Sequence, residues 1–265
     1  MPGTSTIMVK KNLSNLDEII DVVKKLRDPK KGCPWDIQQS AKTLAKYTLE
    51  EAYEVVEAIE TGNYSELEDE LGDLLLQVIY HSVIAEEKKK FNIKNVISKS
   101  VQKMKSRHPH IFLKNENIKS IEDVNEYWEY KKKLERKSKG AKSVLDGVSI
   151  SLPAVTRALK LQKRAAKEGF DWKNSIDTMK KVKEEVNELS MEIKKNNKKN
   201  IKEELGDLFF SCINLSRKLG LDVESVIRDS NRKFEKRFKK MEKNMNKNKL
   251  EWNLKNLEKE WQKSK

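Results

Sequence analysis

The sequence predicts an all-α protein built from tandem copies of one helical unit, and three observations support this prediction. Gly (9) and Pro (5) are scarce among the 265 residues, which is not typical of a loop-rich or all-β fold. Apolar residues make up 37% of the chain, enough for globular cores although charged residues are equally frequent. The phrase EDELGDLLLQV (residues 68–78) returns as KEELGDLFFSC (residues 202–212), and a repeat of this length indicates a duplication.

The first copy begins with a predicted helical hairpin. TLEEAYEVVEAI (residues 48–59) is followed by the polar turn TGNYS (61–65), and four apolar residues then recur with the spacing i, i+3, i+4, i+7. These residues are Leu71, Leu74, Leu75 and Val78. Because the turn is short, we expect the two helices to be antiparallel neighbours.

A basic helix follows this hairpin, from Val96 to Arg107. Pro109 disfavours a helical conformation at His108, so we expect the helix to end there. The polar, Gly-containing stretch around residues 136–144 has the composition of a linker. We therefore expect an amino-terminal domain over residues 1–137, a linker over 138–152 and a carboxy-terminal domain over 153–265.

The second copy repeats these elements. Its first helix carries an apolar stripe, the turn KNNKKN (195–200) follows, and a second stripe comes after the turn. The two stripes are Val182, Val186, Leu189 and Ile193, then Leu205, Leu208, Phe209 and Cys212. The basic helix from Val226 meets no proline and continues past Arg237. Units of this kind leave apolar faces uncovered, so we expect helical bundles that are completed by homodimerisation.

Each hairpin carries four acids, two on each helix, and 19 residues separate Glu51 from Glu70 and Glu185 from Glu204 alike. The first acid cluster consists of Glu51, Glu54, Glu70 and Asp73, and the second of Glu185, Glu188, Glu204 and Asp207. Residues three apart share a helix face, so the carboxylates of one hairpin are expected to converge. Partly buried like charges are costly unless protons or cations neutralise them.

We interpret the clusters as divalent cation sites. All-oxygen ligands are typical of Mg²⁺, with Mn²⁺ as a substitute, rather than of Zn²⁺. Gly72 and Gly206 lie between the acids and indicate either close backbone approach or room for a ligand, because a glycine inside a helix costs about 1 kcal/mol relative to alanine. His81 follows Asp73 by two turns and is either a neighbour of the first cluster or a core or surface residue. The alternative for the acids themselves is a solvated face with lysine partners.

The net charge of +14 suits an anionic partner, but lysines spread over solvated helix faces are the favoured explanation, and nucleic-acid binding is not expected. Cys33 and Cys212 lie far apart without metal-ligand spacing, which favours a reduced, cytoplasmic setting. Residues 1–12 contain no apolar signal core, and no run approaches the length of a membrane span. We therefore expect no membrane partner.

These motifs resemble those of a known family. GCPWD, TLEEAYEVVEAI, LEDELGDLLLQV and SRHPHIF in the first half, and KVKEEVNEL, IKEELGDLFF, KFEKRF and LEKEW in the second, are similar to the two-domain form of the MazG nucleoside triphosphate pyrophosphohydrolases. The similarity extends from about Leu16 to Trp261. The resemblance implies an all-α dimer that uses Mg²⁺ to cleave a nucleoside triphosphate into monophosphate and pyrophosphate. It also implies that the reaction removes unwanted nucleotides from the nucleotide pool.

The resemblance also assigns residues. Both acid clusters fall on the family's metal ligands, and the second cluster is expected to be catalytic. The expected substrate-binding residues are Lys181, Lys202, Lys233, Arg237 and Trp261. Trp261 either stacks on the base or packs on the bundle. Because the second basic helix is uninterrupted, we expect residues 143–265 to carry most of the activity.

Two alternatives stay open at this point. A basic helical module that binds nucleic acid or acts as an adaptor would explain the charge but not the duplicated acids. An enzyme restricted to modified nucleotides or deoxynucleotides would share every motif described above.

Overall fold

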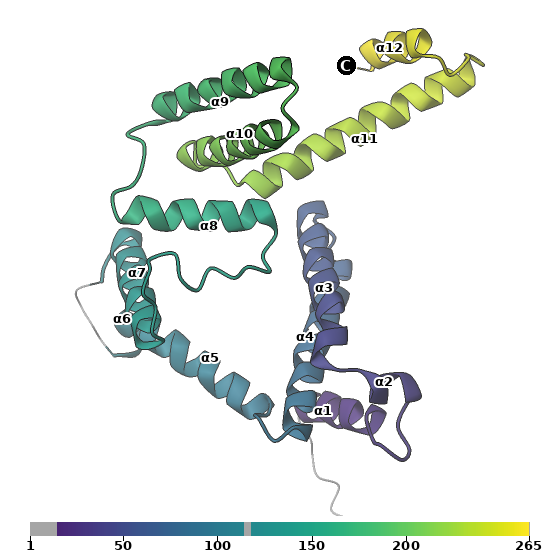
Figure 1. The fold of residues 1–265 in the computed structure, drawn as a ribbon. Helices are drawn as coiled ribbons and strands as arrows, with labels where there is room; N and C mark the ends of the chain where they lie inside the picture. Colours follow the sequence, from purple (N-terminus) through teal and green to yellow (C-terminus); the bar gives the residue numbers. More distant parts are fainter. Residues whose placement is uncertain (1–14, 114–117, 265) are drawn as a thin grey trace, which may run out of the picture. The chain divides into compact units, whose positions relative to one another are not determined.

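The computed structural model describes residues 15–113 and 118–264, and within these residues it contains twelve α-helices and no strand (Figure 1). The all-α prediction is therefore confirmed. Contacts group the chain into two units, Met1–Glu129 and Tyr130–Lys265. The domain limits expected from the sequence, including the linker over residues 138–152, stay a prediction. Residues 1–12, in which the sequence analysis finds no signal core, lie outside the described residues.

The first unit is built around a long helical hairpin. Its helices are α1 (Asn15–Leu26), α2 (Pro34–Gln38), α3 (Ala41–Thr61), α4 (Tyr64–Glu87), α5 (Ile93–Arg107) and α6 (Pro109–Phe112), and α7 (Ile121–Ser138) begins in this unit. α3 packs along α4, and α1 packs against α4. Val23, Leu44 and Ile79 are almost fully buried at the centre of the core that these three helices share.

The second unit contains the equivalent hairpin. It comprises α8 (Ala154–Lys167), α9 (Ser175–Lys195), α10 (Lys198–Lys218), α11 (Val223–Lys247) and α12 (Leu254–Lys263). α9 and α10 lie side by side (Figure 1), α8 packs against α10, and α11 packs against α12. Both hairpins predicted from the sequence are confirmed.

The two hairpin turns use the same local chemistry. Gly62 (φ 70°) and Asn196 (φ 53°) end the first helix of each hairpin in the left-handed region, which glycine and asparagine tolerate best. The next residue, Asn63 or Asn197, caps the following helix, because its side chain accepts a hydrogen bond from a backbone N–H of the first turn. The polar turns therefore fix where each helix stops and the next one starts.

The two basic helices differ as expected. α5 ends at Arg107, and Pro109 occupies the first turn of the short helix α6. α11 runs without interruption for 25 residues and contains both Lys233 and Arg237. A proline at the first turn costs no hydrogen bond, whereas inside α5 it would remove one.

A single chain covers only part of its apolar stripes. Leu71, Leu75 and Val78 on α4 are exposed, and so are Leu205 and Phe209 on α10. A Cβ built on Gly72 or Gly206 meets no atom within 4 Å among the described residues, so the close backbone approach considered for these glycines is not made within this chain. Within residues 15–113 and 118–264, no helix is both long and apolar enough to span a bilayer.

Candidate metal and nucleotide site

The second acid cluster forms where α9 and α10 run side by side. One carboxylate oxygen each of Glu185, Glu188 and Glu204 lies within 4.8 Å of the other two. Glu185 is buried, and the other two are half-buried. Asp207 is exposed and stands outside this triad, although it lines the same cavity as Glu185.

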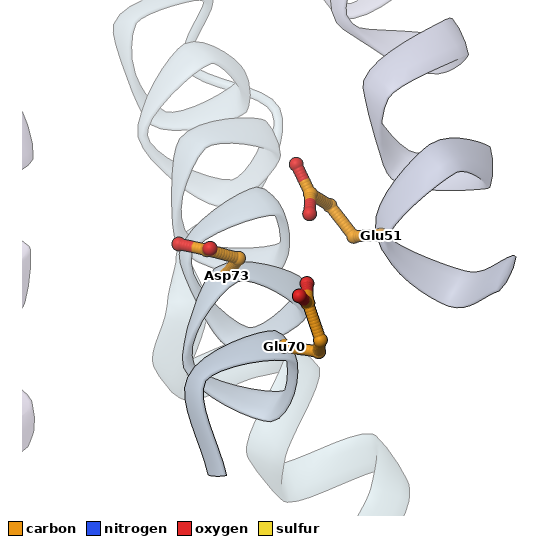
Figure 2. Close-up of side chains that lie close together, drawn as sticks. All are labelled: Glu51, Glu70 and Asp73. Atoms are coloured by element: carbon orange, nitrogen blue, oxygen red, sulfur yellow. The ribbon is translucent and has the colours of Figure 1, made fainter. Parts of the chain in front are cut away.

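The first acid cluster also brings three carboxylates together, but one comes from α3 and two from α4, whereas the second cluster takes two from α9 and one from α10. Figure 2 shows Glu51 extending from α3 towards α4, which carries Glu70 and Asp73. The three carboxylates offer oxygens that lie within 4.8 Å of one another, and Glu54 stands outside this triad. His81 is not part of the group, since its Nε2 lies 2.9 Å from the Thr48 hydroxyl.

Burial and mutual repulsion raise the pKa of acids in both clusters. Partial burial, followed by the negative charges of Glu188, Glu185 and Asp207, raises the pKa of Glu204. In the first cluster, partial burial and then the charge of Asp73 raise the pKa of Glu51. The two acids outside the triads contribute to these pKa shifts. The charge of Asp207 helps to raise the pKa of Glu204, and the charge of Glu54 helps to raise the pKa of both Glu51 and Glu70.

A hard divalent cation fits both clusters. Each offers three or four carboxylate oxygens and no sulfur or imidazole ligand, which is the donor set that Mg²⁺ and Mn²⁺ prefer. A cation would also counter the burial and repulsion that raise the pKa of Glu51 and Glu204, because an opposite charge favours the ionised form.

Lys181 already places a positive charge beside the second cluster. Its Nζ lies 2.8 Å from Glu185 Oε1 and 2.7 Å from Glu184 Oε1. Hydrogen bonds to these two glutamates raise the pKa of Lys181, so its ammonium group stays charged. Lys181, expected from the sequence to bind substrate, therefore lies next to the acids.

A cavity of about 740 Å³ opens beside the second cluster. Glu185, Asp207 and Lys181 are among the residues that line it. Three aromatic residues, Phe170, Trp172 and Phe210, line it as well and form what we name the aromatic wall. All three aromatic side chains are exposed, so this cavity combines charged groups for phosphates with flat apolar surfaces for a base.

The loop that carries two residues of the aromatic wall is held by an ion-pair clamp. The Asp171 carboxylate accepts hydrogen bonds from the guanidinium group of Arg217 and from Lys218 Nζ, the latter at 3.1 Å. Lys218 Nζ also donates to the Trp172 carbonyl at 2.6 Å. The hydrogen bond from Arg217 is the main reason that the pKa of Asp171 is lowered.

The sequence analysis identified the charged residues of this cavity but not its aromatic wall. The one sequence signal that could have pointed to the wall is the similarity of GCPWD (residues 32–36) and GFDWK (169–173), which pairs Trp35 with Trp172. Nothing in the local sequence marks Phe170 or Phe210 as neighbours of the acids, because their proximity depends on how α8, α9 and α10 pack.

The structure brings two of the other expected substrate-binding residues together. The Arg237 guanidinium carbon lies 4.1 Å from the ring centre of Trp261, and the Phe234 ring lies tilted against the same ring at 5.4 Å between centroids. Trp261 also lines a second, apolar cavity of about 440 Å³ between α11 and α12. Lys202 and Lys233 are exposed. None of these four residues lines the cavity beside the second cluster, so their substrate contacts stay a prediction.

Comparison with known proteins agrees with the duplicated site. The model of the MazG nucleotide pyrophosphohydrolase domain matches residues 39–112 and 173–241, which contain both acid clusters. The chain is 38% identical over 255 residues to the nucleoside triphosphate pyrophosphohydrolase of Escherichia coli (strain K12), covering 94% of this chain and 97% of that protein.

Two further relatives cover most of the chain. The nucleoside triphosphate pyrophosphohydrolase/pyrophosphatase MazG of Thermotoga maritima is 38% identical over 254 residues, covering 94% of this chain and 95% of that protein. The uncharacterized protein YabN of Bacillus subtilis (strain 168) is 39% identical over 248 residues, covering 92% of this chain and 50% of that protein. With the domain matched twice and two relatives aligned over nearly their full length, this chain belongs to the MazG nucleotide pyrophosphohydrolase family.

Proposed function

We infer that this protein is a nucleoside triphosphate pyrophosphohydrolase that releases nucleoside monophosphate and pyrophosphate in a reaction that requires Mg²⁺, with Mn²⁺ as a substitute. One observation carries this inference: two hairpins of a MazG-family chain each bring three carboxylates within 4.8 Å of one another. We propose that the enzyme clears unwanted nucleotides from the pool.

The metal ligands in this proposal are the two acid clusters. When bound there, Mg²⁺ supplies charge neutralisation of the triphosphate and a coordinated water of lowered pKa. The Lys181 ammonium group lies beside Glu185 and borders the cavity, and we propose that it contacts a phosphate oxygen. Lys202, which is exposed near the start of α10, is proposed to contact the nucleotide as well.

Side chains of the protein then accept the proton and stabilise the leaving group. A carboxylate of the second cluster accepts the proton of the water that attacks the α-phosphorus, and the bond to the α–β bridging oxygen breaks. Lys233 and Arg237 stabilise the negative charge of the departing pyrophosphate. Arg237 supports this role because its buried Nε and Nη2 find no hydrogen-bond partner among the described residues. Trp261, stacked on Arg237, is proposed to bind the base or to hold that guanidinium in place.

Product identity tests the reaction directly. The purified chain is incubated with each NTP or dNTP and Mg²⁺, and products are separated by anion-exchange chromatography. We expect monophosphate and pyrophosphate in equal amounts. Release of diphosphate and free phosphate would contradict cleavage between the α- and β-phosphates.

We propose that the second copy carries most of the activity. Its basic helix α11 is continuous through Lys233 and Arg237, and preorganised cations stabilise developing charge better than mobile ones. In the full chain, the double substitution Glu185→Gln with Glu204→Gln should lower turnover by at least about tenfold, as expected when a metal site is disturbed. The matched double substitution Glu51→Gln with Glu70→Gln should leave most of the turnover. A larger loss of turnover from this first-copy substitution than from the second-copy one would refute the ranking.

We also propose that the protein is a homodimer. The exposed leucines and Phe209 on α4 and α10 form apolar stripes that a second chain would cover. Light scattering coupled to size exclusion should give the mass of two chains. Phe209→Asp should shift that mass towards one chain, whereas Phe91→Asp, at an exposed phenylalanine between α4 and α5, should not. A wild-type mass of one chain at micromolar concentration would contradict the proposal.

A further inference from the structure

The two acid clusters differ in the residue that lies one helical turn before their first glutamate. Aligning Glu51 with Glu185 places Tyr47 opposite Lys181. The Lys181 ammonium group lies 2.8 Å from Glu185 Oε1, and Glu185 is only 4% exposed. Lys181 therefore holds a positive charge against the most buried carboxylate of the second cluster.

Tyr47 supplies no such charge to the first cluster. Its side chain packs against the core of the first unit, and its ring centre lies 6.1 Å from that of Trp35. Within the part of the chain that the structure describes, no lysine or arginine forms an ion pair with Glu51, Glu70 or Asp73. The first triad is therefore without an internal counter-charge among these residues.

The overall charge of the two hairpins differs in the same sense. α3 and α4 together carry twelve acidic and two basic residues, whereas α9 and α10 carry eight acidic and ten basic ones. Glu68, two residues before Glu70, is aligned with Lys202, two residues before Glu204. Summed charge of one sign raises the local concentration of ions of the opposite sign. The first hairpin therefore attracts a free cation more strongly than the second, and the second tolerates an anion.

A metal ion bound by the second triad would share Glu185 with the Lys181 ammonium group. One charge at about 4–6 Å changes the affinity of a carboxylate for a proton by about 10- to 1000-fold. The same repulsion between cations lowers the affinity of Glu185 and its neighbours for a metal ion. A triphosphate relieves this competition, because its oxygens offer Lys181 other acceptors.

We propose that Lys181 is an internal counter-cation that keeps the second cluster from binding a divalent cation tightly until a triphosphate arrives. Lys181 then turns from Glu185 to the phosphate, and Glu185 becomes free to bind the metal ion. The second site therefore takes up its metal ion together with the nucleotide. The first cluster, with Tyr47 in place of Lys181, binds a divalent cation without nucleotide. This inference rests on the proposed function and states how its two metal sites differ.

The test measures the binding of Mn²⁺ alone to the full chain, with the free ion quantified by electron paramagnetic resonance. Glu51→Gln with Glu70→Gln leaves the second cluster as the intact site, and Glu185→Gln with Glu204→Gln leaves the first. Without nucleotide, the first cluster should bind Mn²⁺ at least about tenfold more tightly than the second. Adding Lys181→Met to the chain with the intact second cluster should strengthen its Mn²⁺ binding by about tenfold.

A second measurement follows the coupling between metal and nucleotide at the second cluster. Its probe is α,β-methylene-ATP, an analogue that resists cleavage between the α- and β-phosphorus atoms. Because coupling between two ligands is reciprocal, Mg²⁺ should raise the affinity of the chain for this analogue, and the gain should be smaller in Lys181→Met. Calorimetric titrations in EDTA and in saturating Mg²⁺ give both affinities.

Two control variants separate the charge of Lys181 from its packing. Lys181→Arg keeps the charge and should leave Mn²⁺ binding at the second cluster within about twofold. Lys180→Met removes a neighbouring lysine that pairs at 2.9 Å with Asp177, outside the cluster, and should change Mn²⁺ binding as little. Equal Mn²⁺ affinities of the two clusters, or no gain with Lys181→Met, would overturn this inference alone. A wild-type chain that binds no Mn²⁺, with or without the analogue, would overturn the proposed metal sites and this inference with them.

Discussion

Replacing Asp171 with asparagine tests how firmly the aromatic wall is held. The carboxylate is shared by Arg217 and Lys218, whose side chains are only 12% and 16% exposed. Asparagine keeps the shape of the side chain but removes the charge that compensates both cations. The two cations would then remain largely withdrawn from water without an acid beside them.

The expected cost follows from the number of charged hydrogen bonds and their burial. A hydrogen bond to a charged group contributes about 1.5–3 kcal/mol, and breaking a fully buried ion pair costs about 3–5 kcal/mol. The Asp171 side chain is 23% exposed, so breaking its ion pairs should cost less free energy than breaking a fully buried pair. We expect Asp171→Asn to lower the unfolding free energy by about 2–3 kcal/mol, which for a unit of this size lowers Tm by about 7–10 °C.

Glu168→Gln is the matched control for this change. Glu168 lies three residues earlier and pairs with Lys133 at 2.8 Å, but their side chains are 41% and 48% exposed. An exposed pair contributes less than about 1 kcal/mol, so this variant should melt close to the wild type. Scanning calorimetry of the full chain compares the two. Equal shifts in Tm for Asp171→Asn and Glu168→Gln would refute the clamp.

The pH dependence gives a second measurement on the same variant. The pKa of Asp171 is lowered from its ordinary value of 3.8 in the folded chain, so its stabilisation is fully present above pH 3.8. It is lost as the pH falls through the lowered folded pKa, where the carboxylate takes up a proton. The difference in Tm between wild type and Asp171→Asn should therefore be the same at pH 7 and pH 5 and shrink below pH 3.8.

Three further predictions concern the acid clusters and the core of the first unit. Glu204→Gln should raise the Mg²⁺ concentration needed for half-maximal pyrophosphate release by about 10- to 100-fold, and a rise under about twofold would argue against a ligand. In EDTA, Tm should decline as the pH rises from 4.5 through the raised pKa values of Glu51 and Glu204, because ionisation of these acids brings repulsion. Saturating Mg²⁺ should flatten this decline, and the same slope of Tm against pH in EDTA and in Mg²⁺ would contradict the prediction. Tyr80→Phe removes a buried hydrogen bond of 2.6 Å to Asp36 Oδ1 and should lower the unfolding free energy by about 1–3 kcal/mol in calorimetry, whereas an unchanged Tm would show that this bond is dispensable.

The features that the sequence predicted correctly are governed by local chemistry. The hairpins follow from helical spacing interrupted by polar turns, and Gly62 and Asn63 act within a few residues of themselves. The end of α5 follows from Pro109 alone. The convergence of Glu185 with Glu204 needed one further assumption, that a short turn makes its two helices neighbours.

The features that the sequence did not predict depend on contacts between distant residues. Asp171 and Arg217 are 46 residues apart, and neither lies in a motif that marks the other. The Gln162 side chain on α8 donates a hydrogen bond to the Phe210 carbonyl on α10, and no pattern of residue types records this contact. The division of the acids into a close triad and a fourth, outer member also depends on side-chain directions that spacing leaves open.

The lengths of α4 and α10 differ, and the difference falls at one end. α4 has 24 residues and α10 has 21, yet the acids sit in the same places after the capping asparagines Asn63 and Asn197. The missing residues therefore come from the end of α10, and at a rise of about 1.5 Å per residue they shorten its axis by about 4.5 Å. Close to one full turn has been removed, so the chain leaves α10 on nearly the same side but nearer to the acids. The connection to α11 therefore begins almost one turn nearer to the carboxylates, measured along the hairpin helix, than the connection to α5 does in the first copy. A small difference in helix length changes where the cationic helix is attached, while the acids of the hairpin keep their places.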